Sequence, residues 1–297
     1  MYHVILNGSH NDEKTEKAIN TVKEVFKIAG KEITVHKTDR PGHAKEIVAK
    51  LTANGEFAHL IAMGGDGTLH EVLNGIADTE NCTLGLIPLG SGNDFAEAAG
   101  LTRNVRRSAE NIAFRAPVCI DYIELENGLR SINAVGTGID VDVLQRAYAG
   151  KAKGRKKYFK ALLKSLIHYK GFHVKACWDG GDEREYTGMI ACLGNGRQIG
   201  GGIVLFPEAE IDDGYIDLLL VDYLSRIKTF FAFIKLATGR INKIKEVTHV
   251  KCKSVKITPV NCTPPVQAEG EIYENVPLNA HIVSDKLKFY LPSKFNN

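Results

Sequence analysis

The sequence has no closely spaced cysteine pair and no long hydrophobic run. Its six cysteines lie at positions 82, 119, 177, 192, 252 and 262, so no two of them form the CxxC motif of a zinc or redox site. No apolar segment approaches the ~20 residues that span a bilayer, and the first residues lack the charged and apolar regions of a secretory signal. These absences argue against a disulfide scaffold and an integral membrane protein, and they favour reduced thiols in a cytoplasmic protein.

An excess of one charge is also absent. The chain carries 38 lysines and arginines against 35 aspartates and glutamates, a formal net charge of +3. So small an excess does not predict nucleic acid as a partner. What is present is ordinary for a globular protein: 44% hydrophobic and 25% charged residues, in a chain of 297 residues that suffices for two cores of usual domain size.

Two patterns of hydrophobic periodicity divide the chain near residue 117. Before it, short apolar runs alternate with helical stripes, which predicts a doubly wound parallel sheet with helices on both faces. The predicted strands there cover residues 2–6, 33–38, 59–63 and 83–89. Beyond it, the pattern predicts a β-rich, largely antiparallel half, and we expect the active site in the cleft between the halves.

The second half is marked by turn signals between strand-like runs. Asn127-Gly128 is the strongest short hairpin signal, and residues 179–182 form another. Further strands are predicted at residues 215–224, 247–258 and 279–291, and helices near 155–170 and 226–238.

The most informative segment, residues 60–71, runs from a strand through three glycines into a helix. Glycines let the backbone approach a ligand, and a helix start presents N–H groups to an anion. Thr68 and Glu71 have the spacing of a capping box. Asp66 inside the loop indicates Mg²⁺ with a nucleotide, because a carboxylate beside phosphates needs a cation between them. A tight turn without a ligand is the alternative, and the pattern is neither a Walker A motif nor a GxGxxG fingerprint.

Residues 88–96, PLGSGNDFA, repeat this layout. A strand leads into glycines and the hydroxyl of Ser91, and a helix follows. In a parallel sheet, loops at the carboxyl ends of neighbouring strands meet at one crevice. Two such loops predict a phosphate site more strongly than either loop alone.

At these residues the chain resembles the catalytic family of diacylglycerol kinases, especially the bacterial soluble lipid kinases. The motif GGDGT at residues 64–68, followed by Glu71, is similar to that family's nucleotide loop and is shared with NAD kinases. Residues 88–96 resemble the lipid kinases and not NAD kinase. The resemblance covers nearly the whole chain and continues at residues 194–196, 200–202, 206–209, 212–214 and 269–271.

The resemblance implies two domains and a set of nucleotide contacts. An α/β nucleotide-binding domain would cover residues 1–117, with residues 288–297 packing back on it, and a β-rich, sandwich-like lipid-binding domain would cover residues 118–287. The loop Asn7-Gly8-Ser9 departs from the family's usual Asn-Pro-x-x-Gly form, and His70 stands where asparagine is usual. The implied ATP contacts are Asn7, Thr38, Gly64, Gly65, Asp66, Gly67, Thr68, Leu69, His70 and Ser91.

A structural Mg²⁺ is implied in the second domain. Its ligands would be the side chain of Asp213 and the backbone carbonyls of Glu210 and Tyr215. An ordinary Asp-Asp-Gly turn before a strand is the alternative interpretation.

The predicted catalytic residues are Asp66, Glu269 and Glu271. Glu271 matches the family's proton acceptor, and Glu269 replaces the usual aspartate of the acidic motif. The resemblance thus implies an ATP-dependent lipid kinase that transfers the γ-phosphate to a lipid hydroxyl such as that of diacylglycerol. The alternatives are a soluble metabolite kinase of the NAD kinase type and a nucleotide- or lipid-binding regulator without catalysis.

The segment 151–170, KAKGRKKYFKALLKSLIHYK, combines a basic start with apolar residues at helical spacing. A basic amphipathic helix can lie on anionic lipid, each Lys or Arg adding about 1 kcal/mol. A surface helix packed on its own domain is the alternative. We expect a cytoplasmic protein, peripheral to the inner face of the membrane, whose partner is a lipid substrate at that surface. A homodimer is compatible with the sequence, which does not identify the lipid.

Overall fold

The computed structural model describes residues 1–8, 13–150, 155–225, 228–229, 232, 235 and 244–292, without the side chains of 155–159. The chain divides into two compact units, each with a core of its own. Unit 1 comprises Met1–Asp121 and Ser284–Asn297, and unit 2 comprises Tyr122–Val283. Ser9, residues 151–154 of the basic segment and most of the predicted helix 226–238 lie outside the described residues.

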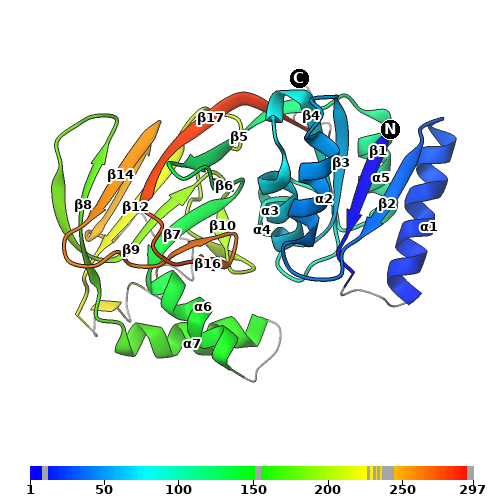
Figure 1. The fold of residues 1–297 in the computed structure, drawn as a ribbon. Helices are drawn as coiled ribbons and strands as arrows, with labels where there is room; N and C mark the ends of the chain where they lie inside the picture. The colour runs from blue at the N-terminus through cyan, green and yellow to red at the C-terminus, as the bar shows by residue number, and fades with distance from the viewer. Residues whose placement is uncertain are drawn as a thin grey trace. The chain divides into compact units, whose positions relative to one another are not determined.

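Unit 1 contains a parallel sheet made from the apolar runs of the first half (Figure 1). Its strands are β1 (Tyr2–Leu6), β2 (Ile33–Lys37), β3 (Ala58–Gly64) and β4 (Cys82–Pro88). They lie in the order β4-β3-β1-β2, and the end of β17 (Leu278–Phe289) pairs in parallel with β4. Gly64 pairs with Pro88 at the last position of β3 and β4, so the loops after both strands leave the same edge of the sheet.

Helices cover both faces of this sheet, as Figure 1 shows: α1 and α5 lie on one face, and α2 and α3 on the other. The apolar residues of α1 recur every three or four positions, so one stripe of the helix is buried against the strands. That stripe consists of Ala18, Ile19, Val22, Val25 and Phe26. The helical elements are α1 (Glu13–Ile28), α2 (His43–Thr52), α3 (Asp66–Gly75), the 3₁₀ turn η1 (Thr79–Asn81), α4 (Asp94–Ala98) and α5 (Val105–Phe114).

Unit 2 is β-rich and antiparallel. Strand β9 pairs antiparallel with β7, β8 and β12, and β14 pairs antiparallel with β8 and β17. Strand β5 begins in unit 1 and ends in unit 2. The strands are β5 (Val118–Leu125), β6 (Arg130–Ser131), β7 (Ala134–Gly138), β8 (Phe172–Trp178), β9 (Arg184–Gly194), β10 (Gln198–Ile199), β11 (Ile203–Val204), β12 (Ile216–Asp222), β13 (Val247–Cys252), β14 (Ser254–Pro259), β15 (Val266–Ala268) and β16 (Glu271–Tyr273).

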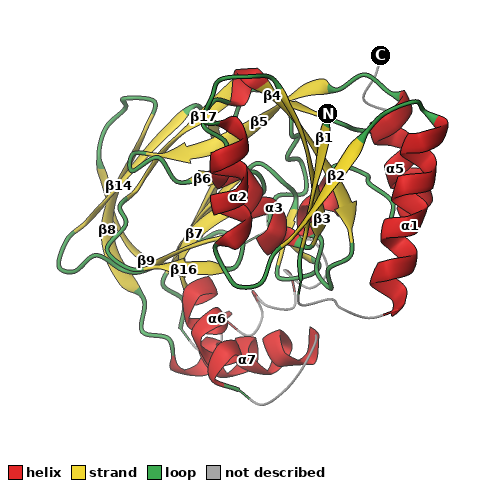
Figure 2. Ribbon diagram, turned by 45° about the vertical axis from the view of Figure 1, so that its right-hand side comes forward, coloured by secondary structure: helices red, strands yellow, loops and turns green. Residues whose placement is uncertain are grey.

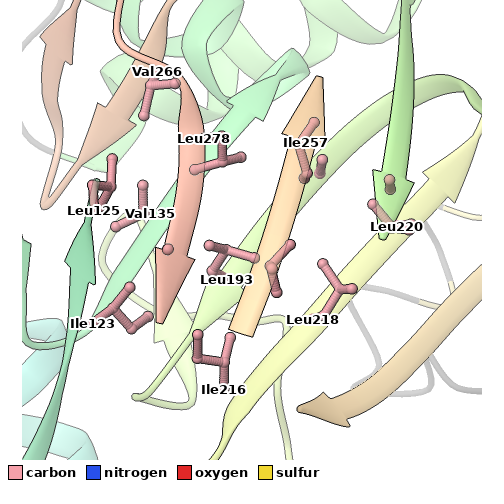
Figure 3. Packing of buried hydrophobic residues seen from close by; sticks show 14 of the residues in the cluster. Ile123, Leu125, Val135, Leu193, Ile216, Leu218, Leu220, Ile257, Val266 and Leu278 are labelled. Carbon is pink, nitrogen blue, oxygen red and sulfur yellow. The ribbon is translucent and has the colours of Figure 1, made fainter. Parts of the chain in front are cut away.

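The strands of unit 2 bury apolar side chains on both faces. Ile216, Leu218 and Leu220 alternate along β12 and join the core that Figure 3 shows. Leu219, between them, packs in a second cluster with Phe206. Two helices, α6 (Ile139–Ala149) and α7 (Arg155–His168), lie side by side in Figures 1 and 2 and contribute side chains to that second cluster.

The structure confirms the predicted fold class and most of the predicted elements. The hairpin at Asn127-Gly128 joins β5 and β6, and the one at residues 179–182 joins β8 and β9. The predicted strand 247–258 is two strands, β13 and β14, which separate at Lys253 and pair with different neighbours. Helix α6 was not predicted; it begins after Gly138, whose φ of 117° suits glycine. No helix among the described residues is long and apolar enough to cross a membrane.

Candidate functional site

The loops that follow β1, β2, β3 and β4 meet at one edge of the parallel sheet in unit 1. The amide of Gly8, after β1, donates to the Oγ1 of Thr38, after β2, at 3.1 Å. Asn7 Nδ2 donates to the Oγ1 of Thr68, in the glycine loop after β3, at 3.4 Å. The amide of Leu89, after β4, donates to the carbonyl of Gly64 at 2.8 Å. The two predicted phosphate loops therefore lie side by side, together with Asn7 and Thr38.

Glycine is required where these loops touch. A Cβ on Gly8 would lie 1.7 Å from the carbonyl oxygen of Thr38, and one on Gly64 would lie 2.3 Å from Thr68 Oγ1. A Cβ on Gly90 would lie 2.5 Å from the Cα of Gly65. The glycines are thus explained by close packing, because a side chain at any of the three positions would collide with a neighbouring loop or with Thr68.

Asp66 joins the two phosphate loops. Its Oδ2 accepts the amide of Asn93 at 2.8 Å, and its Oδ1 accepts the amide of Phe95 at 3.4 Å. These amides lie at the N-terminal end of the short helix α4, where a carboxylate is favourable. The sequence suggested that this carboxylate faces a Mg²⁺; the structure gives it a structural partner, the second loop.

Asn93 is a site residue that the sequence analysis did not single out. It has a positive φ of 58°, its Nδ2 donates to the carbonyl of Gly90 at 2.8 Å, and it is 3% exposed. Its Oδ1 is buried without a hydrogen-bond partner among the described residues. Asparagine tolerates this left-handed conformation better than most residues. An asparagine directly after Gly92 is therefore the sequence feature that could have predicted it.

The first turn of α3 is the candidate anion site. Its first main-chain bond runs from the amide of Leu69 to the carbonyl of Gly65, so the amides of Asp66, Gly67 and Thr68 precede the helical ladder. Groups in this position bind phosphate oxygens well. Leu69 differs from these three residues, because its amide is used within the helix and its side chain is buried in the core.

His70 and Ser91 have opposite environments. The ring of His70 is 3% exposed, and burial lowers its pKa to about 4, with the charge of Lys45 acting in the same direction. The ring is therefore neutral near pH 7. Ser91 is exposed at the tip of the second loop, where its hydroxyl is open to a ligand.

The predicted capping box of α3 is wrong. The helix begins at Asp66, its N-cap is Gly65, and no side chain caps it. Glu71 caps a different helix: its two carboxylate oxygens accept the amides of Gly42 and Ala44, at 2.9 and 3.0 Å, at the start of α2. The spacing between Thr68 and Glu71 suits a capping box. Because α2 packs beside α3, however, the Glu71 carboxylate binds amides of α2.

In unit 2, the predicted catalytic motif is a two-residue hairpin turn between β15 and β16. Glu269 and Gly270 both have positive φ, 52° and 85°, as a type I′ turn requires. Glu269 Oε1 accepts the Ser131 hydroxyl at 2.5 Å and the Asn133 amide at 2.7 Å. Glu269 therefore anchors the hairpin to the start of β7, while Glu271 is exposed at the start of β16.

The predicted metal ligands lie in the turn before β12. Asp213 Oδ1 accepts the amide of Tyr215 at 3.0 Å, and its Oδ2 forms an ion pair with Lys251. Among the described residues, no group of three or more His, Cys, Asp and Glu side chains could hold a metal ion. Because the Lys251 ammonium group is bonded to Asp213, the predicted ligands in this arrangement do not fit a divalent cation.

Comparisons with known proteins agree with this arrangement. Residues 1–125 match the family model described as the diacylglycerol kinase catalytic domain, and residues 133–291 match the YegS C-terminal NAD kinase beta sandwich-like domain. The chain is 30% identical over 303 residues to a diacylglycerol kinase of Bacillus subtilis, with 96% of each chain covered. It is 27% identical over 300 residues to one of Staphylococcus carnosus, with 99% of this chain and 96% of the relative covered.

Solved structures show the same fold. A crystal structure of a diacylglycerol kinase from Bacillus anthracis has a TM-score of 0.79 at 24% identity, covering 99% of this chain and 97% of that one. An NAD kinase from Archaeoglobus fulgidus, in complex with ATP, has a TM-score of 0.55 at 11% identity, covering 100% of this chain and 96% of that one. The expected resemblance is confirmed. The chain therefore belongs to the diacylglycerol kinase family and is a lipid kinase.

Proposed function

We propose that the protein transfers the γ-phosphate of ATP to the hydroxyl of a lipid such as diacylglycerol, in the cytoplasm at the membrane surface. The observation that carries this proposal is the meeting of four loops at the carboxyl edge of the unit 1 sheet, with glycines at their contacts. This edge is where open α/β sheets bind nucleotides. An NAD kinase of related fold has been solved with ATP, which supports the same co-substrate here.

In this reaction, different residues of the chain bind the phosphates, accept the proton and position the base. The amides that precede the helical ladder of α3 bind phosphate oxygens, and Asp66 keeps the second loop, with Ser91, beside them. Glu271 accepts the proton of the lipid hydroxyl as it attacks the γ-phosphate. A carboxylate is a weak base for an alcohol, so it acts late in a loose transition state and orients the hydroxyl. Glu269 positions the hairpin that carries Glu271.

The test is a labelled-ATP assay with diacylglycerol, phosphatidylglycerol, a sphingoid base, undecaprenol and NAD as acceptors, the lipids in mixed micelles. We expect label on a lipid alcohol and none on NAD. Glu271→Gln should lower kcat by roughly 100-fold or more, the usual contribution of a general base. Label on NAD alone would support a metabolite kinase, and ATP binding without any transfer would support a regulator.

Glu274→Gln is the matched control for this assay. Glu274 lies three residues beyond Glu271, just after β16, and is likewise exposed. We expect its kcat to remain within a factor of about two of wild type, as for surface substitutions generally. Equal losses in the two variants would remove Glu271 from the mechanism.

We also propose that helix α7 contacts anionic membrane. Part of its predicted apolar stripe packs inward: Leu162 is buried, and Leu166 lies against the second core cluster. Among the α7 side chains that the structure describes, from residue 160 onward, the exposed apolar ones are Leu163 at 41% and Ile167 at 56%, one turn apart. Lys160 and Lys164 are exposed beside them. An exposed apolar pair among lysines is suited to the interface of an anionic bilayer.

Sedimentation with vesicles of phosphatidylcholine, with and without phosphatidylglycerol, checks this contact. We expect salt-sensitive binding that requires phosphatidylglycerol. The double change Leu163→Ser and Ile167→Ser should weaken binding roughly 10- to 100-fold, because it removes two apolar side chains from the interface. Ile28→Ser, at a residue of α1 that is 67% exposed, should leave binding unchanged. Binding indifferent to charge, or equally weakened in all variants, would contradict the role of α7.

A further inference from the structure

A lysine lies at the turn where the family resemblance implies a metal ion. Lys251 of β13 places its ammonium group on Asp213 Oδ2, and Asp213 Oδ1 accepts the amide of Tyr215. Both oxygens of the predicted Mg²⁺ ligand therefore have partners within unit 2. The ion pair is held in place by the sheet, since β13 pairs antiparallel with β12, directly after the turn.

A second carboxylate shares the same ammonium group. Asp217 lies directly across from Lys251 in the β12–β13 pair, and its Oδ2 is 3.8 Å from the lysine Nζ. Asp217 is 1% exposed; its Oδ1 is 2.7 Å from His249 Nε2, while its Oδ2 has no hydrogen bond among the described residues. A buried carboxylate is costly unless a positive charge faces it. Lys251 supplies that charge.

The surroundings would otherwise suit a divalent cation. The same turn carries Glu210 and Asp212; burial raises the pKa of the Asp212 carboxyl, and the charges of Glu210 and Asp213 raise it further. Carboxylate and carbonyl oxygens in this arrangement are the ligands that Mg²⁺ prefers, at about 2.0–2.1 Å. The Lys251 ammonium group, already bonded to Asp213, occupies an oxygen that Mg²⁺ would need, and its positive charge repels the metal ion.

We propose that the ammonium group of Lys251 is the resident cation of the Asp213 turn, so that unit 2 folds without a divalent ion there. The lysine performs the structural task of a metal: it places a positive charge beside Asp213 and Asp217 and ties the turn to β13. This inference concerns a structural site in unit 2 and holds whichever lipid is the substrate.

Thermal unfolding in the absence of nucleotide tests the proposal. Trp178, the only tryptophan of the chain, lies on β8 in unit 2, so its fluorescence reports the unfolding of that unit. Wild type should have the same Tm, within about 1 °C, in EDTA and in about 10 mM MgCl₂. Lys251→Met should unfold at a lower temperature in EDTA and gain about 5 °C or more with Mg²⁺, the scale for one site at ~100 times its Kd.

Two further variants make the result specific. Lys256→Met, at an exposed lysine of β14, should behave like wild type. Adding Asp213→Asn to Lys251→Met should abolish the response to Mg²⁺. Stabilisation of wild type by Mg²⁺ would overturn the proposal, and so would a Lys251→Met protein that ignores the ion. If Lys251→Met does not fold in EDTA, refolding with Mg²⁺ supports the proposal, and failure to refold in both solutions overturns it.

Discussion

Replacing Asp66 by alanine is expected to lower phosphoryl transfer by at least roughly 100-fold and the free energy of unfolding by about 2 kcal/mol. The carboxylate accepts the amides of Asn93 and Phe95, so its loss leaves the start of α4 uncapped and releases the second phosphate loop. A displacement of about 1 Å in such a loop is enough for a 100-fold loss. Turnover measured with saturating lipid, and urea unfolding of the same sample, check both effects.

Asp66→Asn separates the structural from the chemical role of this residue. The amide keeps one oxygen acceptor, so it should recover part of the lost stability. If position alone matters, activity recovers in parallel; if the negative charge takes part in the reaction, activity stays as low as in the alanine variant.

Asp78→Ala is the control, because Asp78 also accepts a backbone amide, that of Glu80, in an exposed turn of unit 1. It should leave turnover unchanged. An Asp66→Ala protein as stable as wild type would contradict the capping contact.

Gly90→Ala is expected to lower kcat/KM for ATP by roughly 100-fold, chiefly by raising KM. The new methyl group would lie 2.5 Å from the Cα of Gly65 and 2.7 Å from Asn93 Oδ1, so backbone must move and the two phosphate loops must separate. Overpacking of this kind costs about 1–3 kcal/mol of stability, and a phosphate cradle opened by ~1 Å loses its fit to the nucleotide. Initial rates against ATP concentration give the result directly.

The control for Gly90→Ala is a glycine at which a methyl group requires a shift of only a few tenths of an ångström. A Cβ on Gly181, in the hairpin between β8 and β9, would meet only the carbonyl oxygen of Trp178, at 3.3 Å. Gly181→Ala should therefore change kcat/KM by less than about twofold and stability by about 0.5 kcal/mol or less. Unchanged kinetics in Gly90→Ala would place the nucleotide away from the second loop.

Predictions from local sequence patterns were confirmed for features that depend on a few consecutive residues. The strand 2–6 was predicted with its observed bounds, because a buried parallel strand is a run of apolar residues ended by a turn. The two loops at Gly64 and Gly90 were recognised because close backbone approach and a helix start both leave local signatures in sequence. The order of strands then brings such loops together in any parallel sheet.

The sequence did not reveal the hydrogen-bond partners of the carboxylates, because the partner of a charged side chain is set by distant backbone. Asp66, for which a role beside Mg²⁺ stays a prediction, accepts amides of the second loop. Glu71 was expected to cap its own helix and instead caps α2. Glu269, for which a catalytic role stays a prediction, anchors a hairpin to β7. Each carboxylate bonds donors from another segment of the chain, and only packing of the elements decides which donors those are.

The amino-acid sequence alone thus determined the fold class, the place of the two glycine loops and the family, since apolar periodicity and glycine placement act over a few residues. The tertiary structure decided what the acidic side chains do. Asp213 shows why: its partner Lys251 is 38 residues away in the chain, on the strand paired with β12. No local pattern distinguishes a carboxylate that awaits a metal ion from one that already holds an ammonium group, because the difference lies in which strands become neighbours.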